Sequence, residues 1–244
     1  MQGVDDSNTT TFTGIHFMEA MLEQMSIRIN EKIFLKDPSE SDLGNKILRE
    51  GHKMLNEMGF ENFTFKKLAT RLRTTESSVY RYFESKHHFL IYLLNWYWSY
   101  LEYKILVSTA NITQGEEKLK KVIEILCEPE NKTRVIGFFD LSRLYKIAVN
   151  ESAKAYLVNE VDKKNKEGFY LAYKRLCKRI SNIISDVSPG YKYSSTLAVT
   201  LLESISQQKF YSEHLPSLSS FKKNNNGVAV FFYQLAISAI SKRQ

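Results

Sequence analysis

The sequence is poor in glycine and proline. Its 244 residues include ten glycines and four prolines, against average shares of about 7% and 5%. The closest glycines, Gly44 and Gly51, are seven positions apart, so the sequence has no GxGxxG, P-loop or GxSxG motif. This absence disfavours nucleotide-binding loops and hydrolase nucleophile elbows.

Cysteine and histidine are also sparse. Cys127 and Cys177 do not form a close ligand pair and the five histidines have no HxxxH spacing, so we predict no metal site and no cofactor. Nothing orders serine, histidine and aspartate as a triad, which argues against an enzyme. The sequence has no signal-peptide pattern and no apolar run long enough to cross a membrane. We therefore expect a cytoplasmic protein without membrane association.

Helical periodicity dominates what is present. Apolar residues recur at a spacing near 3.6 almost throughout, and no alternating run is long enough for a sheet. The predicted fold class is all-α, with helices at 13–35, 42–58, 64–72, 75–83, 86–110, 116–127, 132–149, 152–187, 192–213 and 226–242.

Two short helices behind a longer one predict a helix-turn-helix. Gly59 is placed to end the longer helix in a left-handed conformation. Thr64, Thr75 and Ser85 are good N-caps for the three helices that follow.

The same segment concentrates positive charge. Residues 64–90 hold six basic and two acidic side chains, whereas residues 1–43 hold three basic and eight acidic. Lys86 falls in the first turn of its helix, where a cation is unfavourable unless an anion such as a DNA phosphate binds there. The outward side chains of the second short helix suit a major groove with phosphates on both rims; they are Thr75, Glu76, Ser77, Ser78, Tyr80, Arg81 and Tyr82.

This segment resembles the TetR family of one-component regulators. The resemblance covers about residues 42–95 and is carried by Gly59-Phe60-Glu61, Phe63-Thr64-Phe65, Leu68-Ala69, Val79 and Tyr80-Arg81-Tyr82-Phe83-Glu84-Ser85-Lys86. It implies a recognition helix at 75–83, with Thr64, Tyr80, Tyr82 and Lys86 on phosphates and Thr75, Glu76, Ser77 and Ser78 facing base edges. It also implies a homodimeric regulator, a repressor on a near-palindromic operator of double-stranded DNA that a small-molecule effector releases.

Two residues depart from the family pattern. Where Arg73 stands the family usually has glycine, so either Arg73 is left-handed at a cost of about 1 kcal/mol or the turn differs. Glu76 replaces a frequent basic residue; it either accepts from a cytosine amino group or simply favours the helix N-terminus. These departures motivate the competing hypothesis, a helical dimer that binds a ligand or protein partner and has lost specific DNA recognition.

The predicted domains are an extension at 1–41, a DNA-binding domain at 42–90, and an effector-binding and dimerisation domain at 91–244. Residues 1–24 lie outside the resemblance: a helical stripe there packs on the body, or the native chain begins at Met25.

Aromatic side chains in the predicted domain at 91–244 have two possible roles. They line an effector cavity, or they pack as ordinary core; the candidates are Trp96, Tyr100, Tyr103, Phe138, Tyr170 and Tyr173.

The last two helices also have two readings. Helix 226–242 is apolar around most of its circumference, and helix 192–213 carries a second apolar face at Leu197, Leu201, Leu202 and Ile205. They form a four-helix interface between two copies, or they are buried within one chain.

Overall fold

The structure, a computed structural model, describes residues 27–128, 134–221 and 227–241. Within these ranges the protein is helical except for loops, short 3-10 turns and one two-stranded hairpin. The all-α prediction is therefore confirmed. The α-helices are α2 (Asp42–Asn62), α3 (Phe65–Leu72), α4 (Glu76–Tyr80), α5 (Lys86–Thr109), α6 (Gly115–Cys127), α7 (Leu141–Tyr156), α8 (Val161–Lys166), α9 (Leu171–Val187), α10 (Ser194–His214) and α11 (Gly227–Ser241).

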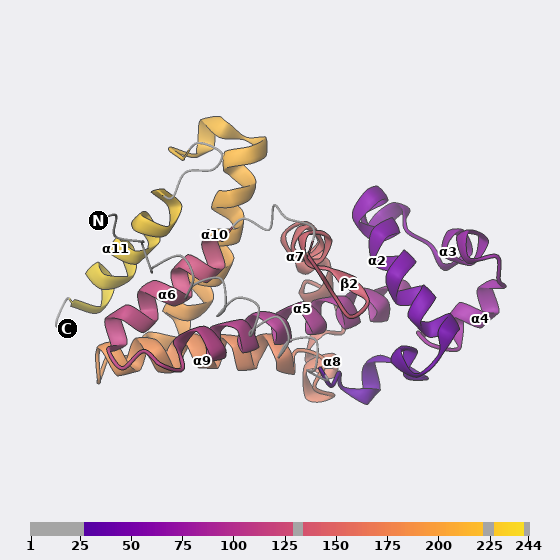
Figure 1. Ribbon diagram of the computed structural model, residues 1–244, viewed down its shortest axis with the longest axis horizontal. Helices are drawn as coiled ribbons and strands as arrows, with labels where there is room; N and C mark the ends of the chain where they lie inside the picture. The colour runs from indigo at the N-terminus through magenta and orange to yellow at the C-terminus, as the bar shows by residue number, and fades with distance from the viewer. Residues whose placement is uncertain (1–26, 129–133, 222–226, 242–244) are drawn as a thin grey trace, which may run out of the picture.

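The helices form an elongated molecule with two different ends. Figure 1 shows α2, α3 and α4 together at one end and α10 and α11 at the other, with α5, α7 and α9 between them. Helix α5 packs on α6, α7 and α9, and α7 packs in turn on α2. The body therefore contacts the first three helices through α7 as well as through the chain itself.

Helix α5 is the central element of this arrangement. Every residue from 89 to 101 is buried, and all of them except Asn95 and Ser99 are apolar or aromatic, as a helix buried on every side favours. At its start, Gly51 of α2 lies so close that a Cβ there would be 2.5 Å from the Phe89 ring. The helix continues through residue 90, where the sequence analysis divides the domains, so that boundary stays a prediction.

The predicted caps form. Thr64 Oγ1 accepts the Lys67 N–H at 3.2 Å, Thr75 Oγ1 accepts the Ser78 N–H at 3.3 Å, and Ser85 Oγ accepts the His88 N–H at 3.3 Å. Each bond satisfies a donor that the first helical turn leaves unpaired. Gly59 has φ +74°, as its position predicts, and a further short turn to Asn62 follows it.

The predicted helix at 132–149 is wrong in its first half. A hairpin occupies this stretch, with β1 (Val135–Ile136) antiparallel to β2 (Phe139–Asp140). Gly137, at φ +59°, supplies the first position of the two-residue turn. Helix α7 then begins where Asp140 Oδ1 accepts the Ser142 N–H at 3.0 Å. The Val-Ile-Gly-Phe-Phe run was the missed signal, because β-branched and aromatic residues around a glycine favour a hairpin.

The predicted helix at 152–187 is wrong as a single element. This stretch holds the end of α7 and the whole of α8 and α9. Gly168, at φ +84°, lies between α8 and α9. Two side chains bind carbonyls at this break: Asn30 Nδ2 donates to Glu167 O and Asn95 Nδ2 to Phe169 O, both at 2.8 Å. These contacts cross the fold, so local sequence spacing does not reveal them.

The predicted helix at 13–35 is wrong over its described part. Residues 27–35 hold a single 3-10 turn, Glu31–Ile33, with Ile33 fully buried. Residues 1–26, including the predicted stripe or tail, lie outside the described residues.

The final helices bury one face each within the chain. On α10 that face is Leu197, Leu201, Leu202 and Ile205, so the expectation that these four side chains are offered to a second copy is wrong. On α11 the buried residues recur every four positions, at Val228, Phe232, Ala236 and Ile240. Outside this buried face, Val230, Phe231 and Leu235 of α11 are exposed.

Candidate DNA-binding site

The turn between α3 and α4 resolves the question about Arg73. Its φ and ψ are 54° and 43°, in the left-handed region. The Arg73 N–H donates to Thr70 O at 3.2 Å, and the Thr74 N–H donates to Ala69 O at 3.0 Å. These two bonds form a Schellman motif that ends α3. The tight helix-turn-helix geometry is thus present without the family's glycine.

Helix α4 presents a short polar surface. It spans Glu76–Tyr80, shorter than the predicted 75–83, and only Val79 is buried in it. Tyr80 keeps 46% of its surface exposed and packs edge-on against Phe65 at 5.1 Å. The other outward residues are Thr75, Ser77 and Arg81, which are exposed, and Glu76 and Ser78, which are half-buried.

Three hydroxyl groups at the start of α4 are joined by hydrogen bonds. Thr75 Oγ1 lies 2.9 Å from Ser77 Oγ and 2.8 Å from Ser78 Oγ. Hydroxyls can both donate and accept, so this cluster offers a compact set of groups for hydrogen bonds with base edges.

Tyr82 does not face outward as expected. It is 5% exposed, and its hydroxyl is hydrogen-bonded to Ser41 Oγ, the N-cap of α2, at 2.8 Å. The prediction of an outward Tyr82 is wrong because α4 ends at Tyr80, which places Tyr82 against α2.

Lys86 is held by the protein rather than by an external anion. Its Nζ donates to Phe60 O at 2.8 Å and to Glu61 O at 3.2 Å, and it lies 4.5 Å from the centre of the Phe60 ring. The carbonyls at the end of a helix carry partial negative charge. They stabilise the ammonium, so the argument that Lys86 requires a bound anion is wrong.

Exposed cations surround the polar surface of α4. The cations Lys66, Lys67, Arg73 and Arg81 are all exposed, and so is the hydroxyl-bearing Thr64. Nearby, Arg71 pairs with Glu50 at 3.2 Å. A hydrogen bond from Lys53 lowers the pKa of Glu50, so this carboxylate stays charged.

Contacts that the sequence pattern does not indicate hold this site to the body. The Phe60 N–H, next to Gly59, donates to Glu151 Oε1 of α7 at 3.0 Å. Lys154 bridges Glu151 at 2.8 Å and Glu61 at 3.3 Å. The hydrogen bond that Lys154 donates to the Glu151 carboxylate raises the pKa of Lys154.

A second contact joins α2 to the hairpin. His52 accepts the Asp140 N–H at Nε2, 3.3 Å away, and its Nδ1 donates to Leu48 O at 2.8 Å. Burial lowers the pKa of His52, so the ring is neutral and can accept at Nε2. These partners are 88 positions apart, and no local pattern indicates the pairing.

The candidate effector residues pack as core in this structure. Trp96 stacks on Tyr100 and tilts against Phe139, and Tyr170 donates to Ala155 O at 3.0 Å. Tyr103, Phe138 and Tyr173 are half-buried.

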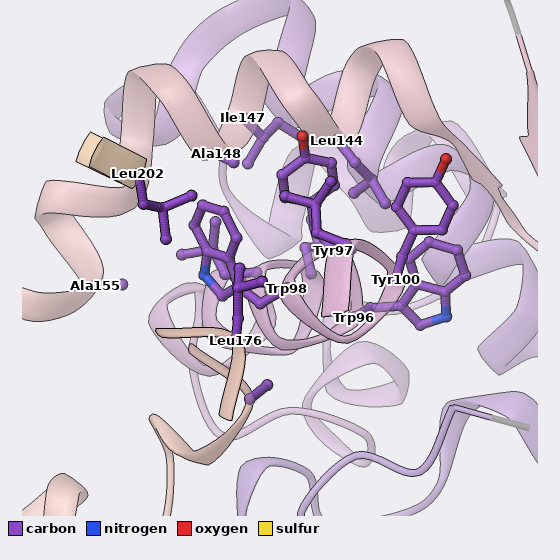
Figure 2. Close-up of a cluster of buried hydrophobic side chains, with 14 of the residues drawn as sticks. Trp96, Tyr97, Trp98, Tyr100, Leu144, Ile147, Ala148, Ala155, Leu176 and Leu202 are labelled. Carbon is purple, nitrogen blue, oxygen red and sulfur yellow. The ribbon is translucent and has the colours of Figure 1, made fainter. Parts of the chain in front are cut away.

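A small pocket lies beside these residues, between α5, α6, α7 and α10, and none of the six candidates lines it. Its lining includes Tyr97 and Trp98, which Figure 2 shows directed toward Ala148 of α7 and Leu202 of α10. The space has room for about one water molecule.

Among the described residues, no three His, Cys, Asp or Glu side chains gather as metal ligands. None of the described helices is both long and apolar enough to span a bilayer.

Comparisons with known proteins agree with this geometry. The model of the family "Bacterial regulatory proteins, tetR family" matches residues 47–93, which include α3, α4 and the start of α5. A comparison with curated protein sequences finds no match.

A solved structure shares the fold beyond the matched segment. The crystal structure of AibR in complex with isovaleryl coenzyme A and operator DNA superposes with a TM-score of 0.54 at 17% identity, covering 78% of this chain and 95% of that one. Residues 47–93 thus match the tetR family of bacterial regulatory proteins, and the chain shares its fold with a solved structure whose complex contains operator DNA.

Proposed function

We propose that the protein is a homodimeric repressor that binds a near-palindromic operator and leaves it when a small molecule binds the helical body. The observation that carries the proposal is the exposed polar surface of α4, which a Schellman turn presents beside exposed Thr64, Lys66 and Arg81. Thr64, Tyr80 and Arg81 take phosphates, while Thr75, Glu76, Ser77 and Ser78 face base edges.

Tyr82 and Lys86 have supporting roles in this proposal. Both are bonded inside the DNA-binding end, to Ser41 and to the end of α2. They position α4 and the start of α5, and Lys86 adds positive charge near a phosphate.

The dimer is supported by the surface of α11. Val230, Phe231 and Leu235 are 53%, 46% and 42% exposed on one side of a helix whose other side is already buried. These exposed apolar side chains, and exposed Val199 of α10, are suited to self-association in a four-helix arrangement.

In the proposed dimer, an effector releases the protein from the operator by changing how the two copies are arranged. Two copies of α4 must fit half-sites about one helical turn apart. A ligand that favours a different arrangement of the two DNA-binding ends lowers operator affinity by its differential affinity for the two states.

Selection from random duplex DNA tests the proposal. We expect recovery of a near-palindrome whose half-sites show one preferred spacing. Uniform enrichment that appears only at low salt would instead favour the alternative, a helical dimer without specific DNA recognition.

Variants at α4 then test the residue roles. Arg81→Gln should weaken binding to every duplex and reduce the slope of log K against log salt by about one, whereas Ser78→Ala should change the preferred sequence. Lys120→Gln removes one exposed charge from α6 and is the matched control. An Arg81→Gln protein with the control's salt slope contradicts the phosphate contact.

A further inference from the structure

A segment that precedes the helix-turn-helix joins the two parts of the molecule. Residues 30–41 include two short 3-10 turns, Glu31–Ile33 and Pro38–Glu40, and lie before the matched residues 47–93. Figure 1 shows this segment, in indigo, running from beside α8 to the end that holds α2 and α4. We call residues 30–41 the N-terminal strap.

Asn30 attaches the strap to the body. Its Nδ2 donates to Glu167 O at 2.8 Å, at the break between α8 and α9. Its Oδ1 accepts the Lys32 N–H at 3.1 Å. A Cβ on Gly168 would lie 2.9 Å from Asn30 Nδ2, so the amide packs closely on the backbone of this break. One side chain therefore caps the first turn of the strap and binds the body.

The middle of the strap packs on the central helix of the fold. Ile33 is fully buried, and the Phe34 ring lies edge-on to Tyr92 of α5, with 6.1 Å between the ring centres. Burial of these apolar side chains offsets the conformational entropy that ordering the segment costs. The strap is therefore held along its length and not at Asn30 alone.

The far end of the strap holds Tyr82, two residues beyond the end of α4. The Leu35 N–H donates to Tyr82 O at 2.8 Å, and Ser41 Oγ is hydrogen-bonded to the Tyr82 hydroxyl at 2.8 Å. The Leu35 side chain is 65% exposed, so the backbone of this residue makes the contact. The strap thus binds Tyr82 at its backbone and at its side chain.

The two anchors of the strap lie close together along the chain. Asn30 binds the body and Leu35 binds Tyr82, with buried Ile33 between them. Such a short, ordered segment has little slack, so the break between α8 and α9 is tied to the end of α4. This connection is separate from α5 and from the contact that Glu151 of α7 makes with α2.

We propose that the strap positions α4 for DNA, and that Asn30 is the positioning residue that anchors it to the body. The inference rests on the proposed function, since it concerns operator binding. Base edges are read by groups that must be placed accurately, whereas binding to an unrelated duplex depends on charge. Loss of the anchor should therefore lower affinity for the operator more than affinity for unrelated DNA.

Asn30→Ser tests the anchor. Serine keeps an acceptor for the Lys32 N–H, as N-cap residues do, but has no amide to donate to Glu167 O. We expect affinity for the selected operator to fall about tenfold, an effect that one lost hydrogen bond can produce. Affinity for an unrelated duplex of the same length should change less than about twofold. Fluorescence anisotropy at one salt concentration measures both.

The same substitution at an exposed site is the matched control. Asn111→Ser changes an exposed residue of the loop after α5 and should leave both affinities unchanged. A purely structural role of Asn30 would lower the two affinities in the same proportion. An Asn30→Ser protein whose ratio of operator to unrelated affinity equals that of the unaltered protein therefore overturns the proposal.

Leu35 provides a second test at the other anchor. Leu35→Pro removes the N–H that Tyr82 O accepts, and Leu35→Ala keeps it. We expect the proline variant to lose the preference for the operator and the alanine variant to retain it. Equal preference in the two variants contradicts the role of this contact.

Operator selection separates this inference from the function on which it rests. An unaltered protein that selects no operator refutes the repressor and the role of the strap with it. An unaltered protein that selects an operator, with an Asn30→Ser variant that is equally specific, refutes the strap alone.

Discussion

Arg73 shows how one residue can depart from a family pattern while the local structure is kept. A left-handed conformation costs a residue with a Cβ about 1–2 kcal/mol, yet the two Schellman hydrogen bonds at Thr70 and Ala69 are made. The folded protein tolerates this backbone cost, and the exposed side chain of Arg73 places a positive charge beside the surface of α4.

Replacing Arg73 separates these two effects. Arg73→Gly should raise the free energy of unfolding by about 1 kcal/mol, because glycine reaches the left-handed region without a Cβ clash. Chemical denaturation measures this change in the free energy of unfolding. Arg73→Ala keeps the strained backbone and loses the same charge, so it should show no such gain, while both variants should lose DNA affinity equally. Equal stability of the two variants would show that the left-handed turn is not strained.

At the scale of elements, helix α7 contacts both the pocket and helix α2. Tyr145, Ala148 and Val149 border the pocket. Glu151 accepts a hydrogen bond from the N–H of Phe60, the residue after Gly59 of α2. Glu151 is 7% exposed, so its contact with α2 is shielded from water.

Removing the Glu151 side chain should loosen this contact. Glu151→Ala leaves the Phe60 N–H without this acceptor and should lower the free energy of unfolding by about 1–3 kcal/mol. Glu151→Gln still offers a carbonyl oxygen and should keep most of the stability. Glu117→Ala, at an exposed position on α6, is the control. If Glu151→Gln is as destabilising as Glu151→Ala, the carboxylate charge rather than the hydrogen bond holds the contact.

Local signals predicted the elements they belong to. Three threonine or serine caps, Gly59 and the Tyr80–Lys86 phrase fixed the helix-turn-helix because each acts within a few residues. Long-range contacts were not predictable in this way. Lys86 reaches back 25 and 26 positions to the end of α2, and the buried pairing of Tyr82 with Ser41 depends on how α2 packs, which no spacing along the chain encodes.

At the scale of the whole molecule, the two ends carry different surfaces. The polar and cationic surface of α4 lies at one end, and the exposed apolar side of α11 at the other (Figure 1). Self-association at α11 therefore leaves both DNA-binding ends exposed.

A charge on α11 should break the proposed dimer. Leu235→Glu places a carboxylate in the apolar contact, where an unpaired charge costs several kcal/mol, so the dimer should weaken about tenfold or more and operator affinity should fall with it. Sedimentation or light scattering measures the mass. Gln234→Glu adds the same charge at an exposed neighbouring position and should have a much smaller effect. A Leu235→Glu protein that stays dimeric places the interface elsewhere.

The unbroken course of α5 has a mechanical consequence. Its 24 residues, at 1.5 Å each, make a rod about 36 Å long that begins shortly after α4 and passes the pocket at Tyr97, Trp98 and Leu101. A tilt of about 5° about one end displaces the other by about 3 Å. If α5 moves as one rigid body, a tilt of this size shifts α4 by close to the rise of one base pair without opening a large cavity in the body.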